Sequence, residues 1–295
     1  MDSFLSILFI SAQLASIYGM VVLAVVLAFR IANFADLTMD GSFTLGAAVG
    51  AESLVRGVHP VLALFYGSLA GALAGVVTAL LHSRVKVNRL LSGIITMTIL
   101  YSVNLRIMGR SNVSLLNESS LFSAFGSENY QLFGSIVFVL LISGFIWLFL
   151  RTDLGYFLRA AGENPRVVIR RGFSEEIFII ISLFVANGVA ALAGGLAAQH
   201  QGFADIGMGT GVVIASLTSL LLGETLLPPR SILRLLLAAL AGAFFYQMII
   251  AVGLRLGINP WDMKLATGFL LVGALVLKHR FHSRRSAENI GSDPL

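Results

Sequence analysis

Cysteine is absent from this 295-residue chain, and only 12% of its residues are charged. A chain without cysteine forms no disulfide and offers no thiol nucleophile or thiolate metal ligand. The five histidines are scattered without the spacing of metal ligands, so we predict no metal site. The shortage of charge accompanies 57% hydrophobic residues and a mean hydropathy of +0.89, which together exclude an ordinary soluble domain.

Long apolar runs separated by short polar breaks account for that hydropathy. A membrane core about 30 Å thick needs roughly 20 apolar residues per helix, and a helix satisfies its own backbone hydrogen bonds in lipid. We therefore predict an all-α integral membrane protein, a polytopic bundle of about 8–9 transmembrane helices. It forms one domain over residues 1–280, with a tail over 281–295. The predicted helices lie near 4–29, 34–53, 60–81, 90–109, 131–150, 176–199, 208–227, 232–254 and 263–278.

Basic residues are distributed unevenly between alternate connections. Fifteen of the twenty lysines and arginines fall in connections that share one side with the C-terminal tail. Because basic loops stay in the cytoplasm, we predict that the N-terminus lies outside and the C-terminus inside. The same bias accounts for the net charge of +5, so we expect these residues to meet membrane lipid and no nucleic acid.

The stretch "LRAAGENPRVVIRRGFSEE", residues 158–176, is the longest strongly polar insertion between the apolar runs. Asn164 followed by Pro165 predicts a helix start, because Asn caps free N–H groups and Pro is pre-set for the first turn. Gly172 predicts the helix end. The intervening "RVVIRR" forms a short amphipathic surface helix. Taken alone, it suits two roles equally: docking into a groove of another protein, or serving as a basic topology signal at lipid headgroups.

Three stretches, in order along the chain, resemble ABC importer permeases of the branched-chain amino-acid permease family. They are "NFADLTMDGSFTLGAA", the insertion with the helix that follows it, and "GMGTGVVIASLTSLLLGE". Within the insertion the matching positions are Arg159-Ala160, Asn164-Pro165 and Gly172. The sequence departs from the family where Asp36 stands in place of the usual histidine, and where Ser and Thr replace small apolar residues in the last stretch. The resemblance therefore implies no particular solute.

The resemblance implies that residues about 152–175 are a coupling segment seated in a cleft of a cytoplasmic ABC ATPase. It also implies an extracytoplasmic substrate-binding protein, a second permease copy in a homodimer, and the bacterial inner membrane as location. Neither GxxxxGKS nor GxxxxGKT occurs in the chain, so we expect no cofactor here and ATP to be used by the partner subunit. The implied function is a non-enzymatic permease that moves an amino-acid-like or nucleoside/vitamin-like solute by alternating access. The expected coupling residues are Arg159, Ala160, Asn164, Pro165, Val168, Arg170 and Gly172.

Two carboxylates stand in the second apolar run. Asp36 and Asp40 are four residues apart, so a regular helix places them on one face, with Asn33 and Thr44 near it. A carboxylate at membrane depth costs free energy, so its presence usually indicates a structural or functional role. Either they line the solute path and bind a solute amine, or they cap a broken helix near Arg30. We favour the second interpretation.

The seventh run contains further polar positions. Ser216 and Thr218 make part of it polar, as in a pore-facing or re-entrant segment, and complete the set of possible pathway residues. We expect Glu224 at its end to be a solvated loop carboxylate; the alternatives are an ion pair with Arg230 or a contact with a partner protein.

The alternative function is an ion-coupled secondary transporter that uses Asp36 or Asp40 as its cation site. An enzyme is a third possibility, but no nucleophile, base or carboxylate pair stands at a useful spacing. Gly67, Gly71 and Gly75, at intervals of four, predict close packing of a neighbouring helix and no chemistry.

Overall fold

The structure is a computed structural model that describes residues 2–124 and 128–290, with side chains described over 7–123, 130–260 and 262–276. The α-helices are α1 (Asp2–Val25), α2 (Thr38–Val55), α3 (Pro60–Ser83), α4 (Arg89–Met108), α5 (Leu121–Ala124), α6 (Glu128–Arg151), α7 (Asp153–Glu163), α8 (Pro165–Arg170), α9 (Glu175–Gln201), α10 (Val212–Leu226), α11 (Ile232–Arg255) and α12 (Met263–Ile290). The remaining elements are the π-helix η1 (Val26–Ile31), the 3-10 helix η2 (Pro260–Asp262), and the strands β1 (Asn112–Ser114) and β2 (Phe203–Asp205).

Each of the nine predicted membrane segments coincides with a helix. Within the described part of the chain, six helices are long and apolar enough to cross a membrane. α2 is too polar to qualify, while α10 and the apolar part of α12 are shorter than a full span. The protein is therefore an all-α polytopic membrane protein, as predicted. The last five residues of the predicted tail lie outside the described residues.

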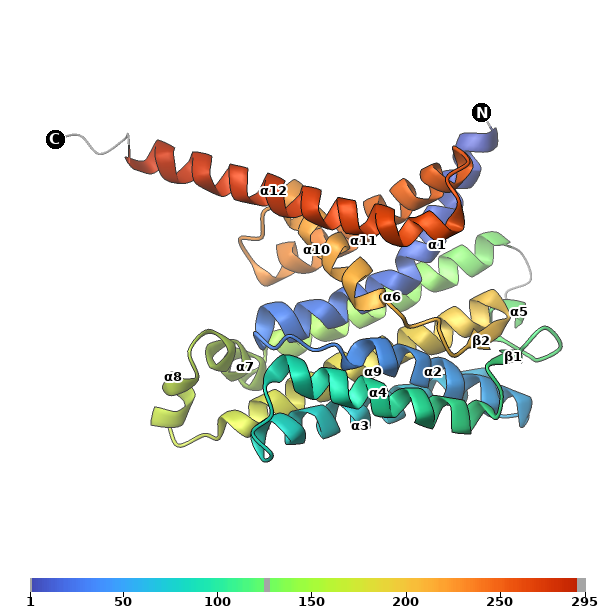
Figure 1. Cartoon of the computed structure of the whole chain (residues 1–295), viewed down its shortest axis with the longest axis horizontal. Coiled ribbons are helices and arrows are strands. Elements are labelled where there is room, and N and C mark those ends of the chain that lie inside the picture. Colours follow the sequence, from blue (N-terminus) through green and yellow to red (C-terminus); the bar gives the residue numbers. More distant parts are fainter. Residues whose placement is uncertain (1, 125–127, 291–295) are drawn as a thin grey trace.

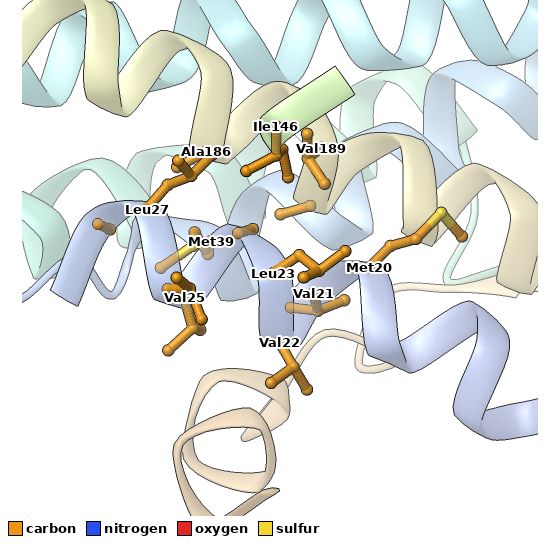
Figure 2. Close-up of a cluster of buried hydrophobic side chains, with 14 of the residues drawn as sticks. Met20, Val21, Val22, Leu23, Val25, Leu27, Met39, Ile146, Ala186 and Val189 are labelled. Atoms are coloured by element: carbon orange, nitrogen blue, oxygen red, sulfur yellow. The ribbon is translucent and has the colours of Figure 1, made fainter. Parts of the chain in front are cut away.

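The core lies around residues 20–28, at the end of α1 and the start of η1, where every side chain is apolar and buried. Figure 2 shows Leu23 and Leu27 on the side of this segment that faces Ile146 of α6 and Ala186 of α9, and Val22 and Val25 on the opposite side. The peripheral helices α4, α6 and α11 are less buried: only 28%, 22% and 33% of their apolar windows lie inside the bundle, as in helices that face lipid or a subunit contact.

Glycine allows α2, α3 and α9 to pack closely at their crossings. A Cβ at Gly71 or Gly75 of α3 would overlap atoms of α9, and a Cβ at Gly67 would lie 2.8 Å from the carbonyl oxygen of Gly46 in α2. The predicted packing role of this glycine stripe is confirmed. These three helices form the most extensive contacts in the bundle.

The connections gather at two opposite ends of the bundle (Figure 1). One end carries α7, α8 and the loops at residues 30–33 and 84–88; we call it the charged end. The other carries β1 and β2, which pair antiparallel with Val113 opposite Ala204; we call it the strand end. After β2, residues 206–211 lead back into the bundle to the start of α10.

Candidate functional site

The polar insertion folds into two consecutive surface helices, α7 and α8. α8 begins where the sequence predicts, with Pro165 in its first turn and Asn164 Oδ1 accepting the N–H of Arg166 at 3.2 Å. Gly172 ends it in a left-handed conformation, with φ of +82°. α7 is not predicted from the sequence, although Thr152 signals its start. The Thr152 hydroxyl caps α7 by accepting a backbone N–H at 3.2 Å.

The inner faces of α7 and α8 hold the pair against the bundle. Val168 of α8 is fully buried in the main core. Gly162 of α7 lies so close to η1 that a Cβ there would overlap the carbonyl oxygen of Ile31. The ring of Phe157 in α7 packs against Phe178 of α9, with their centroids 6.1 Å apart. The pair is therefore attached directly to η1, the segment that leads into α2.

The outer face of this pair combines apolar and basic side chains. Val167 and Ile169 are 44% and 54% exposed, Phe173 is 45% exposed, and Arg170 is exposed beside them. An exposed apolar patch with arginine at its rim is typical of a protein-docking surface. We call Val167, Ile169, Arg170 and Phe173 the α8 face.

The predicted coupling residues lie in three environments. Asn164, Arg170 and Gly172 are exposed, Arg159, Ala160 and Pro165 are half-buried, and Val168 is buried. Val168 does not reach the surface, because a six-residue helix lying on the bundle must turn one side inward. It supports the α8 face from beneath, whereas its neighbours on either side form that face.

Ion pairs join the connections at the charged end. They are Arg84–Glu176 at 2.9 Å, Arg89–Glu175 at 3.4 Å, and Arg30–Glu224. The prediction that Glu224 is a solvated loop carboxylate is wrong, because its side chain is 5% exposed and is reached by Arg30 from the end of η1.

α2 begins inside the bundle, after a non-helical segment over residues 32–37. Asp36 in that segment is completely buried. It accepts the N–H of Thr38 at 2.8 Å and an amide hydrogen of Asn187 at 2.7 Å, and the hydroxyl of Ser42 donates to Asn187 Oδ1 at 2.7 Å. Asp36 thus sits at the start of a broken helix. A shared helix face with Asp40 required a regular helix through both residues, and that condition is not met, because α2 starts two residues after Asp36.

Asp40 and Thr44 of α2 hold the start of α10. The two Asp40 oxygens accept the N–H groups of Gly211 at 2.9 Å and Val213 at 2.8 Å, and the Thr44 hydroxyl accepts the N–H of Gly209 at 3.1 Å. A carboxylate is favourable at a helix N-terminus, where backbone N–H groups are free. Two broken helices, α2 and α10, therefore meet at Asp40, each with a carboxylate at its start.

The other predicted pathway residues lie away from this meeting point. Asn33 is exposed at the charged end, where its carbonyl accepts a hydrogen bond from Arg89 at 2.8 Å. Ser216 and Thr218 are buried within α10, and Thr218 donates to the carbonyl of Ile214. Among the side chains described, no three His, Cys, Asp or Glu residues are grouped to hold a metal ion.

Replacing Asn187 with leucine is expected to lower the free energy of unfolding by about 2–3 kcal/mol, because it leaves a buried carboxyl and a buried hydroxyl short of a partner. Thermal unfolding in detergent measures the effect. Asn117→Leu, at an exposed position, is the matched control. Equal stability of the two variants would mean that the Asp36 contacts contribute little.

Comparisons with known proteins identify the family of this chain. Residues 7–276 match the family described as branched-chain amino acid transport system / permease component. The tyrosine transport system permease protein of Clostridioides difficile is 37% identical over 88% of this chain and 87% of that protein. The probable branched-chain amino acid transport permease protein LivH of Methanocaldococcus jannaschii is 25% identical over 84% of this chain and 78% of that protein.

A solved structure gives the same fold. A chain of PsaBC from Streptococcus pneumoniae, in complex with Fab, matches with a TM-score of 0.50, over 93% of this chain and 89% of that one. At 14% identity this likeness concerns the fold alone. The family match, by contrast, spans all three sequence motifs, the α8 face and both carboxylates. The chain therefore belongs to the branched-chain amino acid permease family, the permease components of ABC transport systems.

Proposed function

We propose that this chain is the membrane-spanning subunit of an ATP-binding-cassette importer, and that its α8 face docks onto a separate cytoplasmic ATPase. The observation that carries the proposal is the α8 face itself. Exposed apolar side chains and an arginine lie on a capped helix that the core supports from behind. The chain has no P-loop sequence. Energy for transport would then enter through contact with a partner.

Alternating access follows if two ATPase subunits close on ATP and carry two α8 faces together. That movement favours an outward-open bundle, and hydrolysis restores the inward-open one. Shifting such an equilibrium from 1:99 to 99:1 takes about 5.5 kcal/mol of differential binding. The α7–α8 pair must therefore be rigid enough to transmit this energy to the membrane helices. The close approach of Gly162 to Ile31 supports this role, because displacement of α7 and α8 reaches η1 and the start of α2.

We extend the proposal to the orientation of the chain and to its partners. In our proposal the charged end faces the cytoplasm, which puts the N-terminus outside and the C-terminus inside, with 8–9 crossings of a bacterial inner membrane. A substrate-binding protein meets the strand end, and a second copy of the chain completes a homodimer. The solute is small and amino-acid-like or nucleoside/vitamin-like; the tyrosine permease among the relatives favours an amino acid.

Co-purification with the candidate ATPase tests the proposal. We expect the native chain to retain the ATPase through size exclusion, and Ile169→Glu to lose it while eluting as a folded protein. Val85→Glu is the matched control, because Val85 is exposed in a neighbouring loop of the same end but lies outside the α8 face. Equal retention by Ile169→Glu and the native chain would place the docking surface elsewhere. No retention by the native chain would contradict the proposal itself.

A further inference from the structure

A cavity of about 420 Å³ lies where α1, α10, α11 and α12 come together. Leu14, Ile250 and Met263 give it apolar walls. Gln201, the last residue of α9, also lines it and places it toward the strand end, because β2 begins two residues later. Since one water takes up about 30 Å³ in the liquid, the space admits a small organic molecule.

Gln247 of α11 presents an unpartnered amide to this cavity. The residue is 9% exposed, lines the cavity and forms no hydrogen bond with any described residue. Other buried polar atoms also lack a partner, such as Asn104 Oδ1 of α4, but these are sealed from any water-sized atom. The Gln247 amide is not among the sealed atoms, so a molecule in the cavity can reach it. A buried amide without a partner is costly, so its place in a cavity wall points to a polar ligand.

Tyr18 of α1 and Lys264 of α12 add two further donors to the lining. Gln201 donates to the Tyr18 hydroxyl oxygen at 3.5 Å, which leaves the hydroxyl hydrogen without an acceptor among the described residues. Lys264 is exposed, and within the described chain it forms no ion pair or hydrogen bond. Its three N–H donors are therefore available to a ligand.

Contacts among the lining residues bring these donors together. Lys264 stands three residues before Thr267, so both lie on the same face of α12. The hydroxyls of Thr267 and Tyr246 are hydrogen-bonded at 2.8 Å, and Tyr246 and Tyr18 lie close enough to interact electrostatically. Gln247 follows Tyr246 directly on α11. The three donors therefore surround one part of the cavity.

The lining carries positive charge and no negative charge. None of the residues that line the cavity is Asp or Glu. Asp40 interacts electrostatically with Lys264 but forms no ion pair with it, and both Asp40 oxygens already accept N–H groups at the start of α10. The cavity therefore joins a cation and two neutral donors with no anion of the described chain between them.

We propose that this cavity binds the carboxylate of a small organic acid, with Lys264, the Tyr18 hydroxyl and the Gln247 amide donating to its oxygens. A carboxylate offers about four acceptor positions and no donor, which matches this set of groups. The apolar walls cover the body of the acid. The inference rests on the proposed transport function, because the cavity lies toward the end where the substrate-binding protein is proposed to dock. It gives that function a chemical class of solute.

Direct binding to the purified permease in a neutral detergent, without ATPase, tests the proposal. The probes are 3-phenylpropionate and pentanoate, with 3-phenylpropanamide and pentanamide as neutral counterparts of the same shape. Calorimetry and thermal unfolding report binding. We expect at least one acid to bind and to raise the unfolding temperature, and its amide to bind about tenfold or more weakly, because only the acid makes charge-assisted hydrogen bonds.

Three variants remove one donor each. Lys264→Gln is expected to weaken binding of the acid about tenfold or more, and Tyr18→Phe and Gln247→Leu about fivefold or more. Arg110→Gln is the control for charge, because it removes one exposed cation near the strand end but outside the cavity lining. It should bind the acid like the native chain.

A fourth variant fills the cavity and leaves every donor in place. Ile214 lines the cavity at a position that is 46% exposed, so Ile214→Trp should block the acid without disturbing the fold. Ile249→Trp, at an exposed position of α11 outside the lining, is its matched control. We expect Ile249→Trp to bind the acid normally.

Several results would overturn the proposal: neither acid binds, the amide binds as tightly as its acid, or the donor and Ile214→Trp variants bind normally. Equal stabilisation by chloride or by phosphatidylglycerol would also overturn it, because it would indicate a general anion site or a lipid headgroup site. The ATPase co-purification is a separate readout. If the native chain fails there but binds the acid, the transport function fails and the acid site stands; the converse result removes the acid site only.

Discussion

Gly194→Val is expected to leave little folded protein. Gly194 lies where α9 crosses α2, and a Cβ there would overlap the backbone carbonyl of Phe43. Because the obstacle is backbone, no change of side-chain rotamer relieves it, and the two helices must separate. Overpacking in a core costs about 1–3 kcal/mol where side chains can adjust; here we expect at least about 3 kcal/mol. The yield of monodisperse protein in detergent and its unfolding temperature measure the loss.

Gly144→Val is the matched control for that experiment. Gly144 is also in an apolar membrane helix, α6, but a Cβ there meets nothing within 4 Å. Both changes carry the same cost of a β-branched residue in a helix. If Gly194→Val is as stable as Gly144→Val, the close crossing of α2 and α9 does not exist in the folded protein.

Val168→Asp and Ile169→Glu are both expected to abolish ATPase docking, but for different structural reasons. A carboxylate at the buried position 168 would lose its hydration, so α8 would detach from the core. Ile169→Glu changes only the surface and leaves α8 in place. Losing a central docking contact lowers the binding free energy by at least about 2 kcal/mol, or roughly thirtyfold in affinity. We expect both variants to lose at least that much affinity for the ATPase.

Limited trypsin cleavage distinguishes detachment of α8 from a change confined to its surface. A detached α8 offers Arg166, Arg170 and Arg171 for rapid cutting, so Val168→Asp should be cut between α7 and α9 much faster than the native chain. Ile169→Glu should be cut at the native rate. Equal cleavage of both variants would mean that Val168 does not anchor α8, and that its burial has no part in forming the docking surface.

Helix positions and helix ends were predictable, because they depend on residues that are close in the sequence. Asn164 and Pro165 start α8, Gly172 ends it, and apolar runs locate nine helices, because caps, turns and hydrophobicity act over a few residues. The glycine stripe of α3 also belongs to this group, since spacing on one helix is enough to predict a flat face.

Contacts between distant segments were not predictable in the same way. Asp36 and Asp40 looked like one helix face, but Asp36 lies in the break before α2, where its contact with Asn187 of α9 fixes it. Glu224 is buried and forms an ion pair with Arg30, which lies 194 residues earlier in the sequence. Nothing near Asn104 in the sequence indicates that its carbonyl oxygen lacks a partner. Each of these depends on three-dimensional packing, which a single sequence does not reveal.

The most direct test of the docking claim uses the absence of cysteine from the chain. Ile169→Cys creates a single thiol on the α8 face, and Leu116→Cys creates one at an exposed position near the strand end. Each variant is assembled with its ATPase and treated with a short thiol-to-amine cross-linker. We predict a permease–ATPase product from position 169 and none from position 116. A stable complex that cross-links at 116, or at neither position, would contradict docking through the α8 face.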